Sequence, residues 1–295
     1  RVGINPLTWT NDDLPSLGGN TPLEQCLSEG KQAGYAGFEL GNKFPRQIEQ
    51  LNSVMAEHDL AVISGWFSGE LLSRSAEEEI IAIEDHLQLL KNTGSTVMVY
   101  CEVTGCIHGS QDVPLSKRPT INAEQWQELG AKLTQVADYC LSHGVRLAYH
   151  HHMGTVVQSS EDIDQLMANT GESVGLLLDT GHLLYADGNP LDVIAKHGDR
   201  IAHVHTKDVR LAVMSDAKNR DISFINAVLN GVFTVPGDGG INYTEIFVAL
   251  RELNYSGWLV VEAEQDPAIA DPLTYASLGF NNIQKFCQQA GLNIS

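Results

Sequence analysis

Histidine and carboxylate side chains follow four apolar runs in the second half of the sequence. The segments are LAYHHHMGT with His150 to His152, LLLDTGHL with Asp179 and His182, HVHTKD with His203 to Asp208, and VVEAEQD with Glu262 and Glu264. Burying so many polar groups at one place would be costly without a ligand. A divalent cation removes that cost, because it supplies the charge that imidazole and carboxylate groups need. The pattern therefore predicts a metal site.

Alternation along an extended chain narrows the choice of ligands, since residues two apart point to the same face. We expect the metal ligands to be His150, Asp179, His205 and Glu262, and the residues beside the ion or on the substrate to be His152, His182 and Glu264. This mixed nitrogen and oxygen set suits Mn²⁺, Co²⁺, Fe²⁺ or Zn²⁺ and disfavours Mg²⁺ and Ca²⁺. Two carboxylates balance the charge of a dication and leave it a usable Lewis acid with positions open to substrate oxygens.

The elements that must position these residues are strands of a parallel sheet. Short apolar, β-branched runs alternate with longer amphipathic segments, which is typical of βαβ units. Eight strands are expected, at Arg1 to Asn5, Gly37 to Leu40, Ala61 to Gly65, Thr96 to Cys101, Arg146 to His150, Gly175 to Asp179, Ile201 to His205 and Gly257 to Glu262. About 37 residues per unit matches a (β/α)₈ barrel. A doubly wound sheet would want a glycine-rich loop after the first strand, where INPLTWTNDD stands instead. We therefore predict an α/β fold, one TIM barrel over residues 1–295.

Such a barrel builds its active site where the strands end at their carboxyl side. Further polar and aromatic residues at these ends are therefore expected to contact a substrate, namely Asn5, Trp9, Glu39, Asn42, Lys43, Trp66 and Phe67. Two long connections, 104–122 and 207–242, are candidates for active-site lids. Helix starts are predicted by capping-box spacing at Thr21 with Glu24, Ser75 with Glu78, and Asn242 with Glu245.

Composition excludes several classes of protein. The net charge of -19, from 37 acidic and 18 basic residues, repels nucleic acid and anionic membranes. No run approaches the ~20 apolar residues that span a bilayer, and five scattered cysteines fit reduced thiols, so we expect a cytoplasmic protein. The sequence starts inside a predicted strand, which leaves room for native residues before Arg1. Monomer and homodimer are both compatible with the acidic surface.

Seven segments in order along the chain carry a family resemblance. GINPLTWTNDDLPSLGG, FELGNKFP, LAYHHHMGT, LLLDTGHL, HVHTKDVR, VFTVPGDGGINY and GWLVVEAEQDP together resemble the myo-inosose-2 dehydratases of inositol catabolism. That family lies within the xylose-isomerase-like TIM-barrel superfamily, whose members hold a divalent metal with strand-end Glu, Asp, His and Glu. The resemblance places the Asp ligand on Asp179, the His ligand on His205 and the last Glu on Glu262. The first ligand departs from the pattern: the superfamily has Glu-Asn-His where this chain has His150 to His152. Either His150 replaces the Glu, or His152 or a water takes its place.

The resemblance implies a reaction, the dehydration of 2-keto-myo-inositol to a trihydroxycyclohexane-1,2-dione. The proton α to the ketone must be removed and the β-hydroxyl lost, so a base and an acid must flank the ring. Lys207, His182 and Glu264 are candidates; we favour Lys207 or His182 for proton transfer at carbon and His152 for the leaving hydroxyl. An ion pair of Lys207 with Asp208 or Glu39 is the structural alternative. The resemblance also implies cobalt or manganese, and glutathione, for which the residues themselves show no pocket.

Three other functions compete with this one. A ketose 3-epimerase or sugar isomerase would form the same enediolate and return the proton; such enzymes usually keep the first Glu ligand, where this chain has His150. An endonuclease on the same barrel would need a basic DNA-binding face, against which the charge of -19 speaks. A metal-dependent polyol-binding protein would bind inosose without consuming it.

Overall fold

A closed barrel of eight parallel strands forms the centre of the molecule, described here for residues 1–294 from a computed structural model. Around the barrel the strands follow the order β1-β10-β7-β6-β5-β4-β3-β2. Their bounds are β1 Val2–Ile4, β2 Gly37–Leu40, β3 Ala61–Gly69, β4 Val97–Glu102, β5 Arg146–His150, β6 Gly175–Asp179, β7 Ile201–Thr206 and β10 Leu259–Val261. The predicted fold class and all eight predicted strands are thus confirmed, with ends that move by up to four residues.

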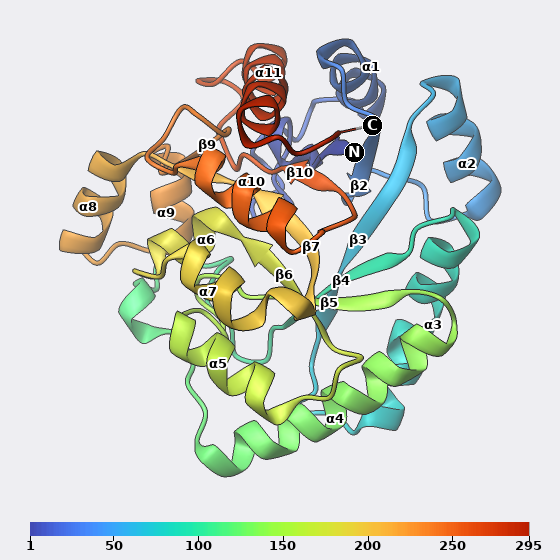
Figure 1. Cartoon of the computed structure of the whole chain (residues 1–295), viewed down its shortest axis with the longest axis vertical. Helices are drawn as coiled ribbons and strands as arrows, with labels where there is room; N and C mark the ends of the chain where they lie inside the picture. Colours follow the sequence, from blue (N-terminus) through green and yellow to red (C-terminus); the bar gives the residue numbers. More distant parts are fainter. Residues whose placement is uncertain (295) are drawn as a thin grey trace.

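Helices surround the barrel, as Figure 1 shows. The α-helices are α1 Leu23–Ala33, α2 Ile48–Glu57, α3 Ala76–Asn92, α4 Ala123–Ser142, α5 Ser160–Asn169, α6 Thr180–Tyr185, α7 Pro190–His197, α8 Leu211–Asn219, α9 Phe224–Leu229, α10 Tyr243–Glu252 and α11 Pro272–Ala290. Short 3-10 turns are η1 Pro6–Thr8, η2 Leu115–Lys117 and η3 Gly198–Arg200.

The helix starts only partly follow the predicted caps. Ser75 and Glu78 form a reciprocal capping box at the start of α3, as expected. The prediction for Thr21 is wrong, because α1 begins at Leu23 and Pro22 occupies the cap position. At Asn242 the predicted helix start is confirmed, since Asn242 is the cap residue of α10, but the capping box is wrong: its side chain makes no capping hydrogen bond, and its ψ of 86° departs from the extended backbone of a usual cap.

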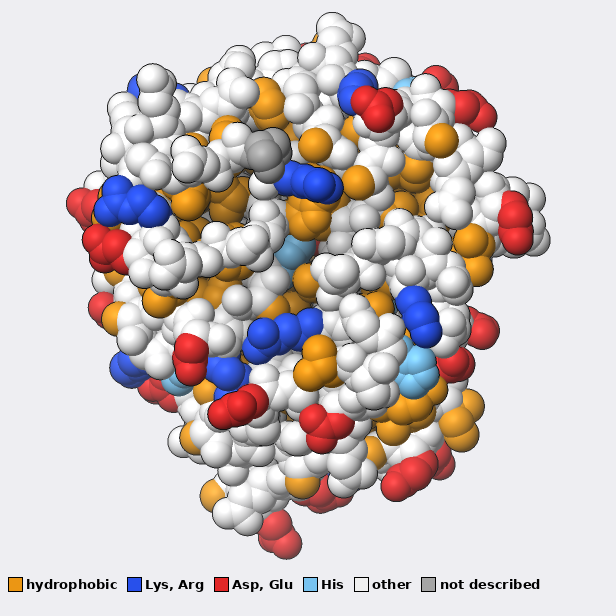
Figure 2. All heavy atoms as spheres, turned by 45° about the vertical axis from the view of Figure 1, so that its right-hand side comes forward, with side chains coloured by type: hydrophobic (Ala, Val, Ile, Leu, Met, Phe, Trp, Pro, Cys, Tyr) orange, Lys and Arg blue, Asp and Glu red, His pale blue; other side chains and the backbone are white. Residues whose placement is uncertain are grey.

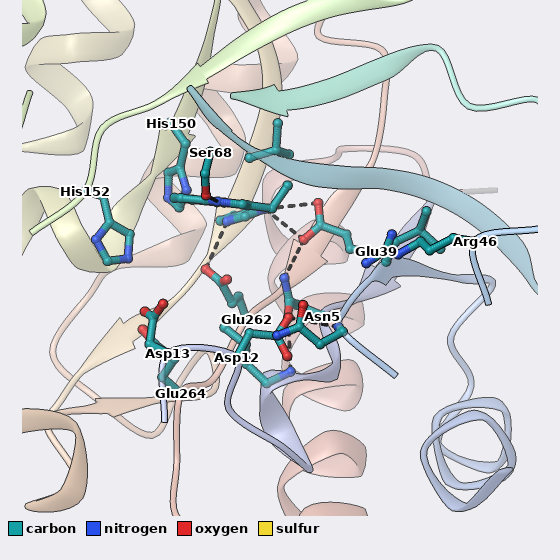
Figure 3. A pocket seen from close by; sticks show the side chains of 16 residues that line it. Asn5, Asp12, Asp13, Glu39, Arg46, Ser68, His150, His152, Glu262 and Glu264 are labelled. Atoms are coloured by element: carbon teal, nitrogen blue, oxygen red, sulfur yellow. Dashed lines mark hydrogen bonds and ion pairs between the residues drawn. The ribbon is translucent and has the colours of Figure 1, made fainter. Parts of the chain in front are cut away.

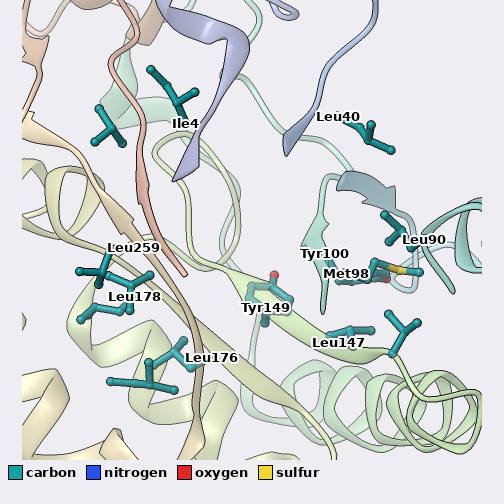
Figure 4. Close-up of a cluster of buried hydrophobic side chains, with 14 of the residues drawn as sticks. Ile4, Leu40, Leu90, Met98, Tyr100, Leu147, Tyr149, Leu176, Leu178 and Leu259 are labelled. Atoms are coloured by element: carbon teal, nitrogen blue, oxygen red, sulfur yellow. The ribbon is translucent and has the colours of Figure 1, made fainter. Parts of the chain in front are cut away.

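Side-chain alternation along the strands separates the core from the site. Leu147, Tyr149, Leu176 and Leu178 are completely buried in the large apolar cluster that Figure 4 shows. The residues between them face the barrel axis, where Val99, Ala148 and Leu177 form a small apolar layer. Two residues further along β5 and β6 stand the polar side chains His150 and Asp179. The two-residue alternation of side chains that builds the barrel core therefore also brings polar groups to the carboxyl end of the barrel.

The two predicted lids pack against each other. The 207–242 connection holds α8, α9 and a small antiparallel pair, β8 Asp208–Val209 with β9 Phe233–Thr234. In the 104–122 connection, the backbone N–H of Ser116 donates to Asp221 Oδ1 at 3.1 Å and its hydroxyl donates to Asp221 Oδ2 at 2.5 Å. Asn226 Nδ2 donates to the carbonyl of Gln111 at 2.9 Å. The segments therefore form one joined structure at the carboxyl end of the barrel.

The surface is mixed in character. On the face in Figure 2, Lys and Arg side chains are interspersed with Asp and Glu, and apolar side chains lie between them. Among the described residues, the helices all fall short of the length and apolar character needed to cross a bilayer.

Candidate metal centre and active site

His150, Asp179, His205 and Glu262 converge at the carboxyl end of the barrel. Each offers one ligand atom, and the four atoms lie within 4.8 Å of one another. Asp179 Oδ2 lies 3.4 Å from both His150 Nε2 and His205 Nδ1, and Glu262 Oε2 lies 2.9 Å from His205 Nδ1. All four side chains are buried. The structure thus brings together the four residues that the sequence predicts as ligands.

Asp179 shows how the local sequence positions a candidate ligand. Its Oδ1 atom accepts hydrogen bonds from the backbone N–H groups of Gly181 and His182 at 2.9 and 2.8 Å and so caps α6. Only Oδ2 is left for the cluster. Gly181 allows the close packing behind it, because a Cβ there would lie 2.6 Å from Cγ of Lys207. The DTGH segment therefore fixes one oxygen in the helix and directs the other inward.

The donor atoms fit a transition-metal ion. Within residues 1–294, His205 Nδ1 has no hydrogen-bond partner, and Glu262 Oε2, 2.9 Å from it, has only the ion-pair contact with Lys207 at 3.1 Å. Buried polar atoms without a hydrogen bond are rare and call for an explanation such as a bound ion. An ion at about 2.0–2.2 Å from each ligand atom brings the donors to within about 4.4 Å of one another. The three separations of 2.9 to 3.4 Å given above, between Asp179 and each histidine and between Glu262 and His205, lie within this limit. The buried cluster could therefore bind a divalent metal ion.

The charges in the cluster favour a cation. Burial opposes the ionisation of Asp179, but the neighbouring His182 and Lys207 outweigh it and hold the pKa of this carboxyl well below its ordinary value. Burial likewise opposes a charge on His205, but the carboxylates of Glu39 and Glu262 raise the pKa of this imidazole well above its ordinary value. The ionised carboxylates therefore favour a positive charge at this position, whether a proton on His205 or a metal ion.

The triple histidine has three separate positions. His150 lies in the cluster, as described. His151 points the other way, and its Nε2 accepts a hydrogen bond from the backbone N–H of Asp179 at 3.2 Å, which ties β5 to the end of β6. His152 Nδ1 donates to the carbonyl of Met153 at 2.8 Å, and the ring lines the cavity.

A second polar cluster adjoins the first and contains His152, His182 and Glu264. Lys207 links the two clusters: its Nζ lies 2.8 Å from Glu264 Oε2, 3.1 Å from Glu262 Oε2 and 3.0 Å from His182 Nε2. The structural alternative, an ion pair of Lys207 with Asp208 or Glu39, is not what the structure shows, because Lys207 pairs with Glu262 and Glu264 instead. Asp208 instead accepts backbone hydrogen bonds from the loop that follows β9.

Burial sets the protonation of this second cluster. It raises the pKa of Glu264 to about 6, although Lys207 opposes the rise. Burial would also lower the pKa of Lys207, but the carboxylates of Glu262 and Glu264 raise it above its ordinary value. His152 and His182 both have a pKa well below the ordinary value, mainly because they are buried. Near neutral pH, Lys207 is thus an ammonium, the two imidazoles are neutral, and Glu264 is mostly ionised.

The second lid forms an apolar wall behind this cluster. The ring of Phe233 lies 4.7 Å from Lys207 Nζ and 5.2 Å from the ring of His182. Phe224 lies 5.0 Å from His152 and 5.6 Å from His182. These contacts keep water from the polar cluster and account for its burial.

The clusters open into a cavity of about 200 Å³, shown in Figure 3. His150 and His152 come from the end of β5, and Glu262 and Glu264 face them from the segment after β10. The lining residues are Asn5, Leu7, Asp12, Asp13, Glu39, Leu40, Asn42, Arg46, Trp66, Ser68, Val99, His150, His152, His205, Glu262 and Glu264. Five of the predicted substrate contacts therefore reach the cavity, namely Asn5, Glu39, Asn42, Trp66 and Glu264.

Two aromatic residues and one lysine that were expected to contact the substrate lie away from the cavity. Trp9 is completely buried, and its Nε1 donates to Glu29 at 2.6 Å, because the turn η1 carries the chain back into the core after β1. Lys43 donates to loop carbonyls, including that of Gly19 at 2.7 Å, and so holds the loop before α1. Phe67 points outward, where it stacks on Tyr100. None of these three side chains is among the described residues that line the cavity.

Four polar residues line the cavity that the sequence does not predict as site residues, namely Asp12, Asp13, Arg46 and Ser68. The consecutive acids of TNDD, shortly after the first strand, were a usable signal in a barrel whose site lies at the strand ends.

Comparison with known proteins agrees with this architecture. A family model described as "Xylose isomerase-like TIM barrel" matches residues 27–285. Among solved structures, an L-ribulose 3-epimerase is similar with a TM-score of 0.69 and 16% identity, over 99% of this chain and 95% of that one. The probable 3-DHS dehydratase AsbF of Bacillus anthracis is similar with a TM-score of 0.68 and 14% identity, over 96% and 98%. At such identities the likeness shows the fold alone.

Curated relatives are much closer in sequence. The rhizopine catabolism protein MocC of Rhizobium meliloti is 50% identical over 295 residues, which are 100% of this chain and 91% of MocC. The inosose dehydratase of Geobacillus thermodenitrificans is 44% identical over 289 residues, 97% of each chain. An inosose dehydratase of Clostridium perfringens is 44% identical over 278 residues, 94% of each chain. The chain therefore belongs to the xylose isomerase-like TIM-barrel family and, within it, to the inosose dehydratase family.

Proposed function

We propose that this protein dehydrates 2-keto-myo-inositol to a trihydroxycyclohexane-1,2-dione with the help of a divalent metal ion. The observation that carries the proposal is the 44% identity with inosose dehydratases over nearly the full length of both chains. The geometry supports it, because a buried set of two imidazoles and two carboxylates opens into a polar cavity of suitable size for a small polyol.

The metal would be held by His150, Asp179, His205 and Glu262, and when bound it supplies Lewis-acid stabilisation of negative charge on the substrate oxygens. The nitrogen-containing ligand set favours Mn²⁺ or Co²⁺, with Zn²⁺ or Fe²⁺ as alternatives.

Glu264 is placed to take the proton α to the ketone. It lines the cavity, and a carboxyl group with a pKa of about 6 is ionised at neutral pH while remaining basic enough for proton transfer. A ring nitrogen of His152 and one of His182 lie within 4.8 Å of a carboxylate oxygen of Glu264. The proton can therefore reach the departing β-hydroxyl through this cluster. The C–H and C–O bonds break, a carbon–carbon double bond forms, and water leaves; the enol so formed then transfers its hydroxyl proton to the former β-carbon and becomes the dione.

Lys207 has a positioning role in this scheme, in place of the proton transfer at carbon favoured from sequence. Its ammonium contacts Glu262 and Glu264 from behind and holds both carboxylates in place. Asn42 and Trp66, which also line the cavity, are left to contact the hydroxyls and ring of the substrate.

The test incubates protein reconstituted with Mn²⁺ or Co²⁺ with 2-keto-myo-inositol and follows dione absorbance, with ketose epimerisation measured in parallel. We expect dione to form in wild type. Epimerisation without dione would favour the epimerase function, and stoichiometric binding without turnover would favour a polyol-binding protein. Each assay is run with and without glutathione, since the family resemblance implies it.

A matched pair of variants tests the role of Glu264. In Glu264→Gln we expect loss of dione formation and of α-proton exchange in D₂O, with metal content retained. Asp266→Asn is the control, because Asp266 caps the following turn through the backbone N–H of Ala268. Proton exchange at the wild-type rate in Glu264→Gln would exclude Glu264 as the base.

A role in rhizopine catabolism is the second candidate, favoured by the 50% identity with MocC. Competition by rhizopine against 2-keto-myo-inositol distinguishes the two: tight competition together with slow turnover of inosose would favour the second candidate.

A further inference from the structure

Glu39 is a buried carboxylate inside the barrel that contacts two other strands and the residue after a third. It belongs to β2 and is 3% exposed. Its neighbours are Asn5 after β1, Ser64 on β3, and His203 and His205 on β7. Sequence position alone suggested a contact with substrate, but these neighbours surround both oxygens.

All four neighbours donate hydrogen bonds to Glu39. The amide of Asn5 has a fixed orientation, because its Oδ1 accepts from the backbone N–H of Leu7 at 3.0 Å, and its Nδ2 therefore faces Glu39 Oε2 at 2.7 Å. Ser64 Oγ donates at 2.5 Å and His203 Nε2 at 2.8 Å, both to Oε1. These contacts favour the ionised carboxylate, whose two oxygens only accept hydrogen bonds.

The same carboxylate fixes the orientation of His205. His205 Nε2 lies 3.1 Å from Glu39, and its other nitrogen, Nδ1, faces Asp179 and Glu262. A histidine that binds a metal through one nitrogen commonly donates its other N–H to a carboxylate, which fixes the ring and increases its strength as a ligand.

We infer that Glu39 is a positioning residue of the metal site: it holds His205 as the Nε2–H form, with Nδ1 directed at the ion. Asn5, Ser64 and His203 in turn hold Glu39. The inference rests on the proposed metal site. It gives Glu39 the role of supporting the ligand His205, instead of the contact with substrate that its strand position suggests.

The first test measures metal affinity by Co²⁺ titration of the full chain. Glu39→Gln keeps the size of the side chain but replaces one acceptor oxygen by an amide that faces donors, so we expect Co²⁺ binding to weaken by about 10–100-fold. Glu79→Gln is the matched control, since Glu79 is also completely buried but accepts from the backbone N–H of Glu70 and from Tyr100, away from the cavity. It should bind Co²⁺ as wild type does.

The second test needs no variant. In wild-type protein labelled with ¹⁵N-histidine and loaded with Zn²⁺, we expect NMR to show His205 bound through Nδ1 and protonated at Nε2, with a proton shifted downfield by the carboxylate. In Glu39→Gln this proton signal should move upfield or be lost.

The outcomes distinguish a failure of the proposed metal site from a failure of the role of Glu39. Wild-type protein that binds neither Co²⁺ nor Zn²⁺ would overturn the proposed metal site. If wild type binds metal, then unchanged affinity in folded Glu39→Gln, or coordination of His205 through Nε2, would overturn the role of Glu39 alone. If Glu39→Gln does not fold, the wild-type NMR result decides.

Discussion

Replacing Asp179 by Asn separates the two roles of one side chain. Asp179 Oδ1 caps α6 through Gly181 and His182, whereas Oδ2 faces His150 and His205. Asn caps a helix as well as Asp does, so Asp179→Asn should keep the cap. The amide nitrogen that replaces Oδ2 cannot bind a cation. We therefore expect a folded protein that has lost its metal.

The expected losses of metal affinity and of unfolding free energy follow from the two contacts that Asp179 makes. Losing a residue that only orients a ligand costs about 10–100-fold in metal affinity. Losing the ligand oxygen itself, with its charge, should cost more than about 100-fold, or more than about 2.7 kcal/mol. Asp179→Ala removes the cap as well, and its free energy of unfolding should fall by a further ~0.5–2 kcal/mol relative to Asp179→Asn.

The assay combines elemental analysis, Co²⁺ titration and urea unfolding of both variants without added metal. Asn189→Ala is the control for a lost cap alone, because Asn189 caps α7 through the backbone N–H of Leu191, away from the cavity. It should lose stability and keep full metal affinity. Asp179→Asn protein that retains one equivalent of metal at wild-type affinity would refute the ligand assignment.

Three further predictions concern pH, packing and metal removal. The dehydration rate should rise with pH through about 6, because Glu264 must lose its proton to act as a base; a rate independent of pH between 5 and 7 would contradict this. Gly181→Ala should lower the free energy of unfolding by about 1–3 kcal/mol, since its Cβ would meet Cγ of Lys207 at 2.6 Å; urea unfolding measures this, and a neutral effect would show that the packing is looser than described. Chelation should lower the melting temperature of wild type, because an ion at 100 times its Kd stabilises the fold by about 2.7 kcal/mol; Glu262→Gln should show little change, and an equal shift in both would place the stabilising ion elsewhere.

The metal cluster could be predicted because two simple periods act together. Side chains alternate along a strand, and a barrel of parallel strands gathers their carboxyl ends at one face. His150 and Asp179 each stand two residues beyond an inward apolar residue, Ala148 and Leu177 respectively. Strand position alone therefore identified the side chains that meet.

Residues in the loops could not be placed in this way. Trp9 follows β1 just as Asn5 does, but the turn η1 directs it into the core, and nothing in strand periodicity describes that turn. The role of His151 depends on a backbone N–H of the next strand, and that of Glu39 on donors from β1, β3 and β7. Such roles arise from contacts between distant segments, which become visible only in three dimensions.

Anomalous scattering from crystals of the Co²⁺-loaded protein tests the central claim most directly. The account predicts one strong peak at the carboxyl end of the barrel, about 2.0–2.2 Å from His150 Nε2, Asp179 Oδ2, His205 Nδ1 and Glu262 Oε2. A peak held instead by His152, His182 and Glu264, or no peak in crystals of active protein, would contradict it.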